Sequence, residues 1–115
     1  MAKYETQLTG SFDQTLAFLE QRIQNSADSM NLVDLSDFSL GETKIAVRVY
    51  DKYFMRNGSR ASLTLTLAGT GDKLYLCAIG AGGGNGIVFN FSLGAESALV
   101  AVVEKAVESL RQESM

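Results

Sequence analysis

The closely spaced glycines between Gly80 and Gly86 are the first feature of this chain that could do chemistry. Such glycines let backbone N–H groups approach an anion, as in loops that bind dinucleotides or nucleoside triphosphates. A G-x-G-x-x-G spacing read from Gly80 would need glycine where Asn85 stands. The run also leads into an apolar stretch typical of a strand, and no lysine of a phosphate-binding loop follows. The pattern favours a hairpin turn, with an anion-binding loop or a mobile flap as the alternatives.

The cysteine and the carboxylates are the other side chains that could react or bind a metal. Cys77 is the single cysteine and the chain has no histidine, so it contains neither the usual base for a thiol nucleophile nor a second thiol for a redox pair. Asp28, Asp34, Asp37 and Glu42 lack the alternating-oxygen spacing of a calcium loop. We interpret Cys77 as a small packed residue and the carboxylates as solvated turn residues. The prediction is therefore no catalytic residue, no metal and no cofactor.

Length and charge limit the remaining classes of function. The chain has 115 residues, 46% hydrophobic and 20% charged, which is typical of a single domain, here over residues 1–115. A net charge of −3, with lysines and arginines spread along the chain, provides no basic surface for nucleic acid. Residues 1–7 have no apolar core of a secretory signal, and no apolar run approaches the about 20 residues that span a bilayer. We expect a cytoplasmic protein that binds neither nucleic acid nor membrane.

Between Thr43 and Ser92 the apolar residues recur with a period of two, which is typical of antiparallel strands with one apolar face. The alternating residues are Ile45, Val47 and Val49; Leu63, Leu65 and Leu67; Leu74 and Leu76; and Ile87, Phe89 and Phe91. We interpret them as four consecutive strands of a meander, after a short strand over residues 30–36 that could face either side. Residues 1–10 are polar and are assigned no helix or strand.

The turn at Arg56-Asn57-Gly58 sets the register between the first two strands of the meander. A two-residue Asn-Gly turn would pair Val49 with Thr66 and would mismatch the apolar and polar faces. A three-residue loop with Gly58 at positive φ pairs Val49 with Leu65 and keeps one face apolar. We therefore predict the bulged three-residue loop.

The two later links complete the meander. A two-residue turn at Thr70-Gly71 pairs Leu67 with Leu74. The glycine-rich link then places Ala78 opposite Ile87. These registers put all four alternating sets on one face of the sheet.

Two amphipathic helices flank the strands. Ser11 can cap a helix in which Gln14 completes a capping box. This helix is predicted over residues 11–25 from the stripe Phe12, Leu16, Leu19 and Ile23. A second is predicted over residues 94–111 from Leu99, Val102, Val103, Ala106, Val107 and Leu110. The predicted fold is α+β, a two-layer sandwich in which a four- to five-stranded antiparallel meander sheet carries the N- and C-terminal helices on one face.

Several segments of the chain resemble those of a known family. They are the segments 46–53 and 63–67, the segment 76–79 with its glycine run, and the helix start Gly94-Ala95-Glu96. Through them nearly the whole chain resembles a family of short bacterial proteins that is known only as a domain of unknown function. The resemblance implies a bacterial and cytoplasmic origin, and it implies no activity, cofactor or functional residue.

The face of the predicted sheet away from the helices, the open sheet face, is the candidate binding surface. With the predicted registers, Arg48, Thr66, Tyr75 and Asn90 form one row and Tyr50, Thr64, Cys77 and Val88 the next, followed by Lys52, Ser62, Ile79 and Gly86. Short side chains in the middle make this a shallow trough. An antiparallel sheet commonly wets one face. The aromatic and aliphatic residues instead suggest cover by a second subunit or a small ligand. The candidate binding residues are Arg48, Tyr50, Thr64, Thr66, Tyr75, Ile79 and Val88.

The sequence contains no signature that identifies a function. The leading hypothesis is a small non-enzymatic module that self-associates, as a homodimer, or binds a partner through the open sheet face or an exposed strand edge. The alternative is a small-molecule binding protein that uses the trough near Arg48, Tyr50 and Tyr75. An enzyme that works with carboxylates and tyrosine is the third hypothesis, for which no constellation is visible.

Overall fold

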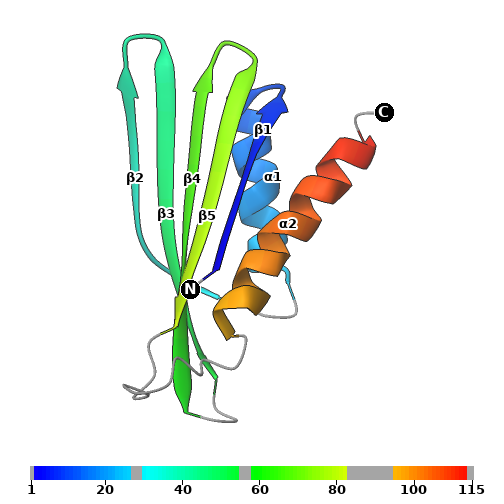
Figure 1. The fold of residues 1–115 in the computed structure, drawn as a ribbon. Coiled ribbons are helices and arrows are strands. Elements are labelled where there is room, and N and C mark those ends of the chain that lie inside the picture. Colours follow the sequence, from blue (N-terminus) through cyan, green and yellow to red (C-terminus); the bar gives the residue numbers. More distant parts are fainter. Residues whose placement is uncertain (1, 27–29, 55–57, 83–94, 114–115) are drawn as a thin grey trace.

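The computed structural model of the protein describes residues 2–26, 30–54, 58–82 and 95–113. These residues form one five-stranded antiparallel sheet with two helices packed against it (Figure 1). The elements are β1 (Ala2–Thr9), α1 (Phe12–Gln24), β2 (Asn31–Leu40), β3 (Thr43–Phe54), β4 (Ser59–Thr70), β5 (Lys73–Gly82) and α2 (Ala95–Glu113). In the sheet the strands follow the order β1-β5-β4-β3-β2. The predicted fold class is confirmed.

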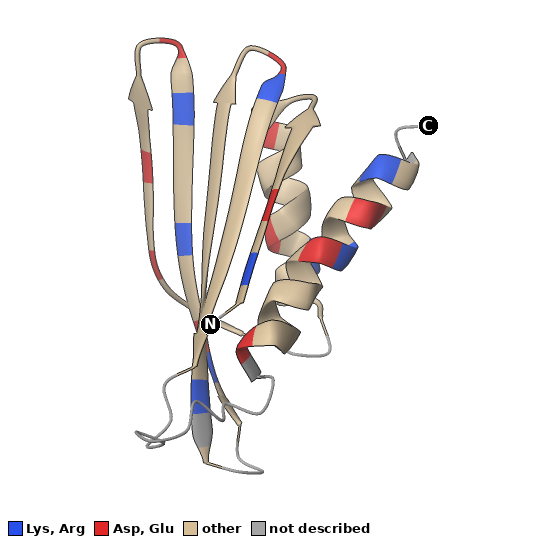
Figure 2. Cartoon of the chain, viewed as in Figure 1, with Lys and Arg blue, Asp and Glu red and all other residues tan. Residues whose placement is uncertain are grey.

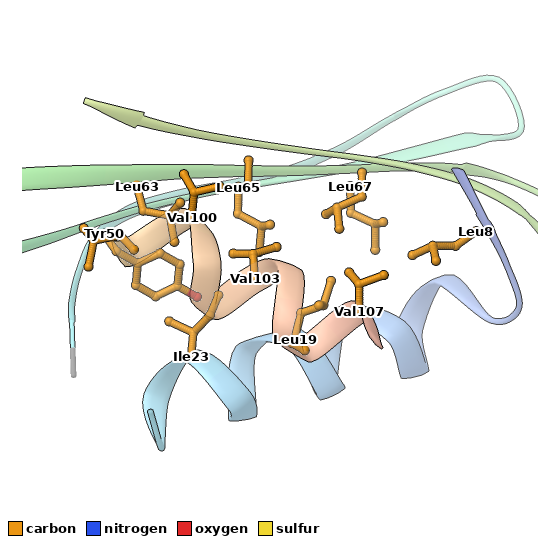
Figure 3. Packing of buried hydrophobic residues seen from close by; sticks show 14 of the residues in the cluster. Leu8, Leu19, Ile23, Tyr50, Leu63, Leu65, Leu67, Val100, Val103 and Val107 are labelled. Atoms are coloured by element: carbon orange, nitrogen blue, oxygen red, sulfur yellow. The ribbon is translucent and has the colours of Figure 1, made fainter. Parts of the chain in front are cut away.

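Both predicted helices form, and both cover the same face of the sheet. The Ser11 side chain caps α1 by accepting a hydrogen bond from the backbone N–H of Gln14 at 3.2 Å. α2 packs on β1, β4 and β5, and α1 packs on α2 and β4. The core therefore lies between the sheet and the helices, where Figure 3 shows apolar side chains from both layers meeting. Its fully buried members include Leu19, Ile23, Leu63, Leu65, Leu67, Leu76, Leu99, Val103 and Val107.

The N-terminal strand β1 corrects the prediction that the first ten residues form no element. β1 pairs with β5, so that Leu8 lies opposite Leu74 and is 8% exposed. The prediction instead placed a strand over residues 87–91 next to β5. Residues 87–91 lie outside the described residues. With β1 on one side of β5 and β4 on the other, the predicted pairing of Ala78 with Ile87 is wrong.

The register between β3 and β4 differs from the prediction by one residue. Val49 lies opposite Thr64 and not Leu65. Phe54 pairs with Ser59, and the backbone N–H of Gly58 donates to the carbonyl oxygen of Phe54 at 2.9 Å, so four residues and not three lie between the paired strand ends. Gly58 has φ +69°, as predicted. Because successive side chains of a strand point to opposite faces, the shift of one residue reverses the predicted facing of β3.

The register between β4 and β5 differs by two residues, which leaves the faces as predicted. Leu67 lies opposite Leu76 and not Leu74, because the turn comprises Gly71 and Asp72 between the paired residues Thr70 and Lys73. Gly71 adopts φ +61°, a conformation that favours glycine. β2 extends beyond the predicted range to Leu40 and has a register shift between Leu32 and Asp34.

Candidate interaction surface

The seven predicted binding residues do not lie on one surface. Thr64, Thr66, Tyr75 and Ile79 lie on the open sheet face as predicted, because the shift between β4 and β5 is an even number of residues. Arg48 and Tyr50 lie on the face that the helices cover, where they are 5% and 6% exposed. Val88 lies outside the described residues. The predicted trough between Arg48, Tyr50 and Tyr75 therefore does not form.

Arg48 is a buried cation that ties α1 to the β2–β3 hairpin. Its Nε donates to Glu20 Oε2 at 2.6 Å, and its Nη1 donates to Asp37 Oδ1 at 2.9 Å and to the carbonyl oxygen of Val47 at 3.0 Å. Burial by itself lowers the pKa of Arg48, but the hydrogen bonds to Asp37 and Glu20 outweigh burial and raise it above its usual value. Its charge is thus neutralised within the chain, and its role is structural.

Tyr50 belongs to the hydrophobic core. In Figure 3 its ring lies among the core side chains between the sheet and the helices, near Ile23 and Leu63. Burial, with a further contribution from the Glu20 carboxylate, raises the pKa of the Tyr50 hydroxyl. Tyr50 is therefore a neutral packing residue at physiological pH.

Four rows of residues cross all five strands on the open sheet face. In strand order the rows are Lys3, Ile79, Thr64, Val49 and Asp34; Glu5, Cys77, Thr66, Val47 and Ser36; Gln7, Tyr75, Ala68, Ile45 and Phe38; and Thr9, Lys73, Thr70, Thr43 and Leu40. The charged members lie on the edge strands β1 and β2, except Lys73, which is the first residue of β5. Figure 2 shows the middle of β4 and β5 without charged residues. The centre of this face is thus apolar or neutral, with Ile45, Val47 and Val49 half-buried and without helix cover.

The β1 side of this face carries a polar cluster. The Tyr75 hydroxyl donates to the Glu5 carboxylate, and Lys3 Nζ lies 3.5 Å from Glu5 Oε1. The hydrogen bond from Tyr75, followed by the Lys3 charge, lowers the pKa of Glu5. The same hydrogen bond is the main cause that raises the pKa of Tyr75 to about 12. Tyr75 is therefore a neutral donor held by Glu5 at physiological pH.

Cys77 lies on the open sheet face between Glu5 and Thr66 and is half-buried. Burial first, and then the Glu5 charge, raises the pKa of the Cys77 thiol. The protonated thiol is the unreactive form, since the thiolate is the nucleophile.

The glycine run has a packing role at its first residue. A Cβ on Gly80 would lie 2.6 Å from the carbonyl oxygen of Glu96 and 2.9 Å from Cγ2 of Val100, so the absence of a side chain lets α2 approach β5. Residues 83–86 lie outside the described residues, and the anion-binding alternative stays untested.

The carboxylates predicted as turn residues are separated. Asp34 and Asp37 lie within β2 and point to opposite faces, because they are opposite Val49 and Ala46. Asp37 binds Arg48, whereas Asp34 accepts a hydrogen bond from the backbone N–H of Leu35 at 2.8 Å. Asp28 lies outside the described residues. Across the four described ranges, acidic residues and Cys77 nowhere gather in a group of three that could hold a metal ion.

A surface hollow of about 820 Å³ lies at the end of the sheet where β1, β4 and β5 meet. Its volume is in the range of small-molecule pockets. Its lining comes from both faces of the sheet and from the end of α2, and includes Gln7, Leu8, Gly69, Lys73, Tyr75 and Arg111. Within the described part of the chain every buried side-chain nitrogen and oxygen has a hydrogen-bond partner, so no unpaired polar group points to a ligand there.

A family model covers residues 1–111 of the chain. The chain belongs to the DUF6054 family of unknown function. This confirms the predicted kind of family. No curated protein and no solved structure matches this DUF6054 member. In the described residues, no helix is both long and apolar enough to cross a membrane.

Proposed function

We propose that this protein is a non-enzymatic self-association module whose open sheet face packs against the open sheet face of a second copy. One observation carries the proposal. β3 turns Ile45, Val47 and Val49 away from the helices, so the sheet is apolar on both faces at its centre. An antiparallel sheet with one wet face would carry polar residues at these positions. The module would act in the bacterial cytoplasm, the setting that the sequence predicts.

The size of this face supports the proposal. Five strands about 4.8 Å apart, with about ten residues each at about 3.3 Å per residue, present roughly 800 Å². That is the area that each partner contributes to a stable interface of standard size. A second copy can supply the matching surface by two-fold symmetry, because a two-fold interface uses the same patch on both partners.

The distribution of polar groups also supports the proposal. Interface cores are depleted in charged residues and interface rims are polar. On the open sheet face the charged residues Lys3, Glu5 and Asp34 lie on the two edge strands, and Lys73 and Asp51 lie toward the ends of β5 and β3. The aliphatic residues lie between these charges. The arrangement fits a contact that buries the β3, β4 and β5 columns and leaves β1 and β2 at the rim.

Small-molecule binding, the alternative function, loses its predicted site because Arg48 and Tyr50 are buried on the other face. The hollow lined by Lys73 and Arg111 is the place where this alternative would now be tested. No polar group in the described residues favours a ligand there over the apolar centre of the open sheet face, so self-association remains the proposed function.

Sedimentation of a Val47→Lys variant tests the proposal. Val47 lies in a central row of the face, on the middle part of β3, and a lysine there would place a charge near the centre of the contact. We expect the mass of the assembly at high micromolar concentration to fall by half, with an unchanged circular dichroism spectrum. Tyr75→Lys, in a neighbouring row, should act in the same direction.

The matched control is Glu108→Gln, which changes the net charge by the same amount on an exposed residue of α2. Its assembly should keep the wild-type mass. A wild-type protein that sediments as a monomer at high micromolar concentration would disprove the proposed function. So would an assembly that Val47→Lys leaves intact.

A further inference from the structure

The edge strand β2 is exposed over all ten of its residues. Eight large hydrophobic side chains are exposed among the described residues, and five of them lie on β2: Leu32, Val33, Leu35, Phe38 and Leu40. In Figure 1 β2 forms the left edge of the sheet. A long apolar edge strand presents unpaired backbone groups and apolar side chains together, and these are the groups that another strand would cover.

The opposite edge of the sheet, β1, is covered at Gln7 from within the chain and carries the charged residues Lys3 and Glu5. Nη2 of Arg111 donates two hydrogen bonds to β1. One goes to the carbonyl oxygen of Gln7 at 2.9 Å, and the other goes to Thr6 Oγ1 at 2.8 Å. The Arg111 side chain of α2, with its positive charge, thus lies against β1. β2 contains no lysine, arginine or proline, the residues that commonly block an edge, and its register shift near Val33 leaves the segment from Asp34 to Leu40 regular.

We propose that β2 pairs antiparallel with β2 of a second copy, which joins two five-stranded sheets into one ten-stranded sheet. The asymmetry of the edges is the reason for choosing a second copy as the partner. Among the described residues only the β2 edge is lined with exposed large hydrophobic side chains, and a two-fold pair in which each β2 covers the other leaves no such edge exposed. This contact does not depend on the open sheet face, and it exists or fails independently of the proposed function.

The turn between β2 and β3 determines which backbone groups are available. Gly41 and Glu42 form a two-residue turn that makes Leu40 and Thr43 a hydrogen-bonded pair. Hydrogen-bonded and non-bonded pairs alternate along an antiparallel ladder, so Ser36 directs its N–H and C=O toward β3. The residues Leu35, Asp37 and Ser39 direct theirs outward, and of these the Leu35 N–H donates to Asp34 Oδ1, a local hydrogen bond on an exposed residue that pairing with a second strand would replace.

The charges of β2 limit the register of the pairing. A two-fold axis at Asp37 would place two carboxylates directly opposite each other, which is unfavourable. An axis at Ser36 places Leu35 of each copy opposite Asp37 of the other and overlaps the strands from Leu32 to Leu40. Leu32 then lies beside Leu40 of the other copy, so these apolar side chains gain an apolar cross-strand neighbour.

Two serines of β2 provide a matched pair of proline substitutions. Ser39→Pro removes an outward N–H, whereas Ser36→Pro removes an N–H of the ladder with β3. Both are made in the Val47→Lys background, so that contact through the open sheet face does not contribute to the measured mass. In that background the unsubstituted β2 should give a dimer. We expect Ser39→Pro to convert it to a monomer with little change in the urea midpoint, and Ser36→Pro to lower the urea midpoint.

Backbone amide hydrogen exchange of the Val47→Lys protein gives a second readout that needs no change in β2. The amides of Asp37 and Ser39 should exchange at least tenfold more slowly at high than at low protein concentration. A Val47→Lys protein that is a monomer at high micromolar concentration would overturn the proposal. A dimer that survives Ser39→Pro, or outward amides that exchange rapidly at every concentration, would also overturn it.

Discussion

Gly80→Ala tests whether the close approach of α2 to β5 is a packing requirement. The added Cβ would lie 2.6 Å from the carbonyl oxygen of Glu96, 2.9 Å from Cγ2 of Val100 and 3.2 Å from the carbonyl carbon of Glu96. Two of these three atoms belong to the backbone of α2 and cannot rotate away. The first turns of the helix must therefore move outward, away from a core in which Leu99 and Val103 are fully buried.

The expected loss follows from two opposing effects. Replacing glycine by alanine at a backbone conformation that alanine can adopt stabilises a protein by about 0.4 to 1 kcal/mol through the unfolded chain. Overpacking a core costs about 1 to 3 kcal/mol, and a backbone neighbour favours the upper half of that range. The net loss should be about 1 to 2 kcal/mol, which lowers Tm by roughly 5 to 15 °C in a domain of this size.

Urea unfolding at a fixed protein concentration measures this loss, with two comparison variants. Gly69→Ala meets only side-chain atoms, Cδ2 of Leu74 at 2.7 Å and Cδ2 of Phe12 at 2.9 Å, which can move, so it should cost less. Val100→Ala, added to Gly80→Ala, relieves only the contact with Cγ2 and should not restore the wild-type stability. If Gly80→Ala alone is as stable as wild type or more stable, the steric argument is refuted.

Two further predictions concern the polar clusters. Glu20→Ala leaves buried Arg48 with Asp37 as its remaining carboxylate, and since the Glu20 side chain is 38% exposed the expected loss is about 1 to 2 kcal/mol in urea unfolding. Arg48→Met, which removes the buried charge itself, should cost less, and a larger loss than for Glu20→Ala would contradict this account. Glu5 has a lowered pKa and Tyr75 a raised one, so their hydrogen bond stabilises the fold above the usual pKa of Glu5 and below that of Tyr75. This stabilisation disappears as the pH rises through about 12. Phenolate absorbance should show Tyr75 titrating near 12, and Glu5→Gln should lower that pKa toward 10; an unchanged titration would exclude the hydrogen bond.

The two helices and the positive φ of Gly58 could be predicted from the sequence because their signals are local, whereas the length of the turn before β4 and the position of the turn before β5 were predicted wrongly. Ser11 and Gln14 lie within one turn of α1, and the apolar stripe of each helix repeats within a few residues. Gly58 adopts the positive φ that its place in a turn required. In each case the physical cause lies within a short segment, so a short segment of sequence was sufficient.

β1 and the facing of β3 were decided only by the tertiary structure. β1 has few apolar residues to mark it as a strand. It forms one because its backbone pairs with the edge of β5 and because α2 packs against it and covers Leu8. In β3 both sets of alternating residues can be buried, since Arg48 becomes acceptable inside the fold once Glu20 and Asp37 neutralise it. Glu20 is 28 positions away in the chain, and no local pattern indicates that contact.

The same reasoning explains which part of the candidate surface was predicted correctly. Tyr75 and Ile79 were placed on the right face because a register error of two residues preserves facing. Arg48 and Tyr50 were placed on the wrong face because an error of one residue reverses it. Sequence alone determined that β3, β4 and β5 each alternate. Which side of β3 meets the helices was set by the length of the turn that follows it and by the ion pairs of buried Arg48, one of which depends on Glu20, 28 positions away in the chain.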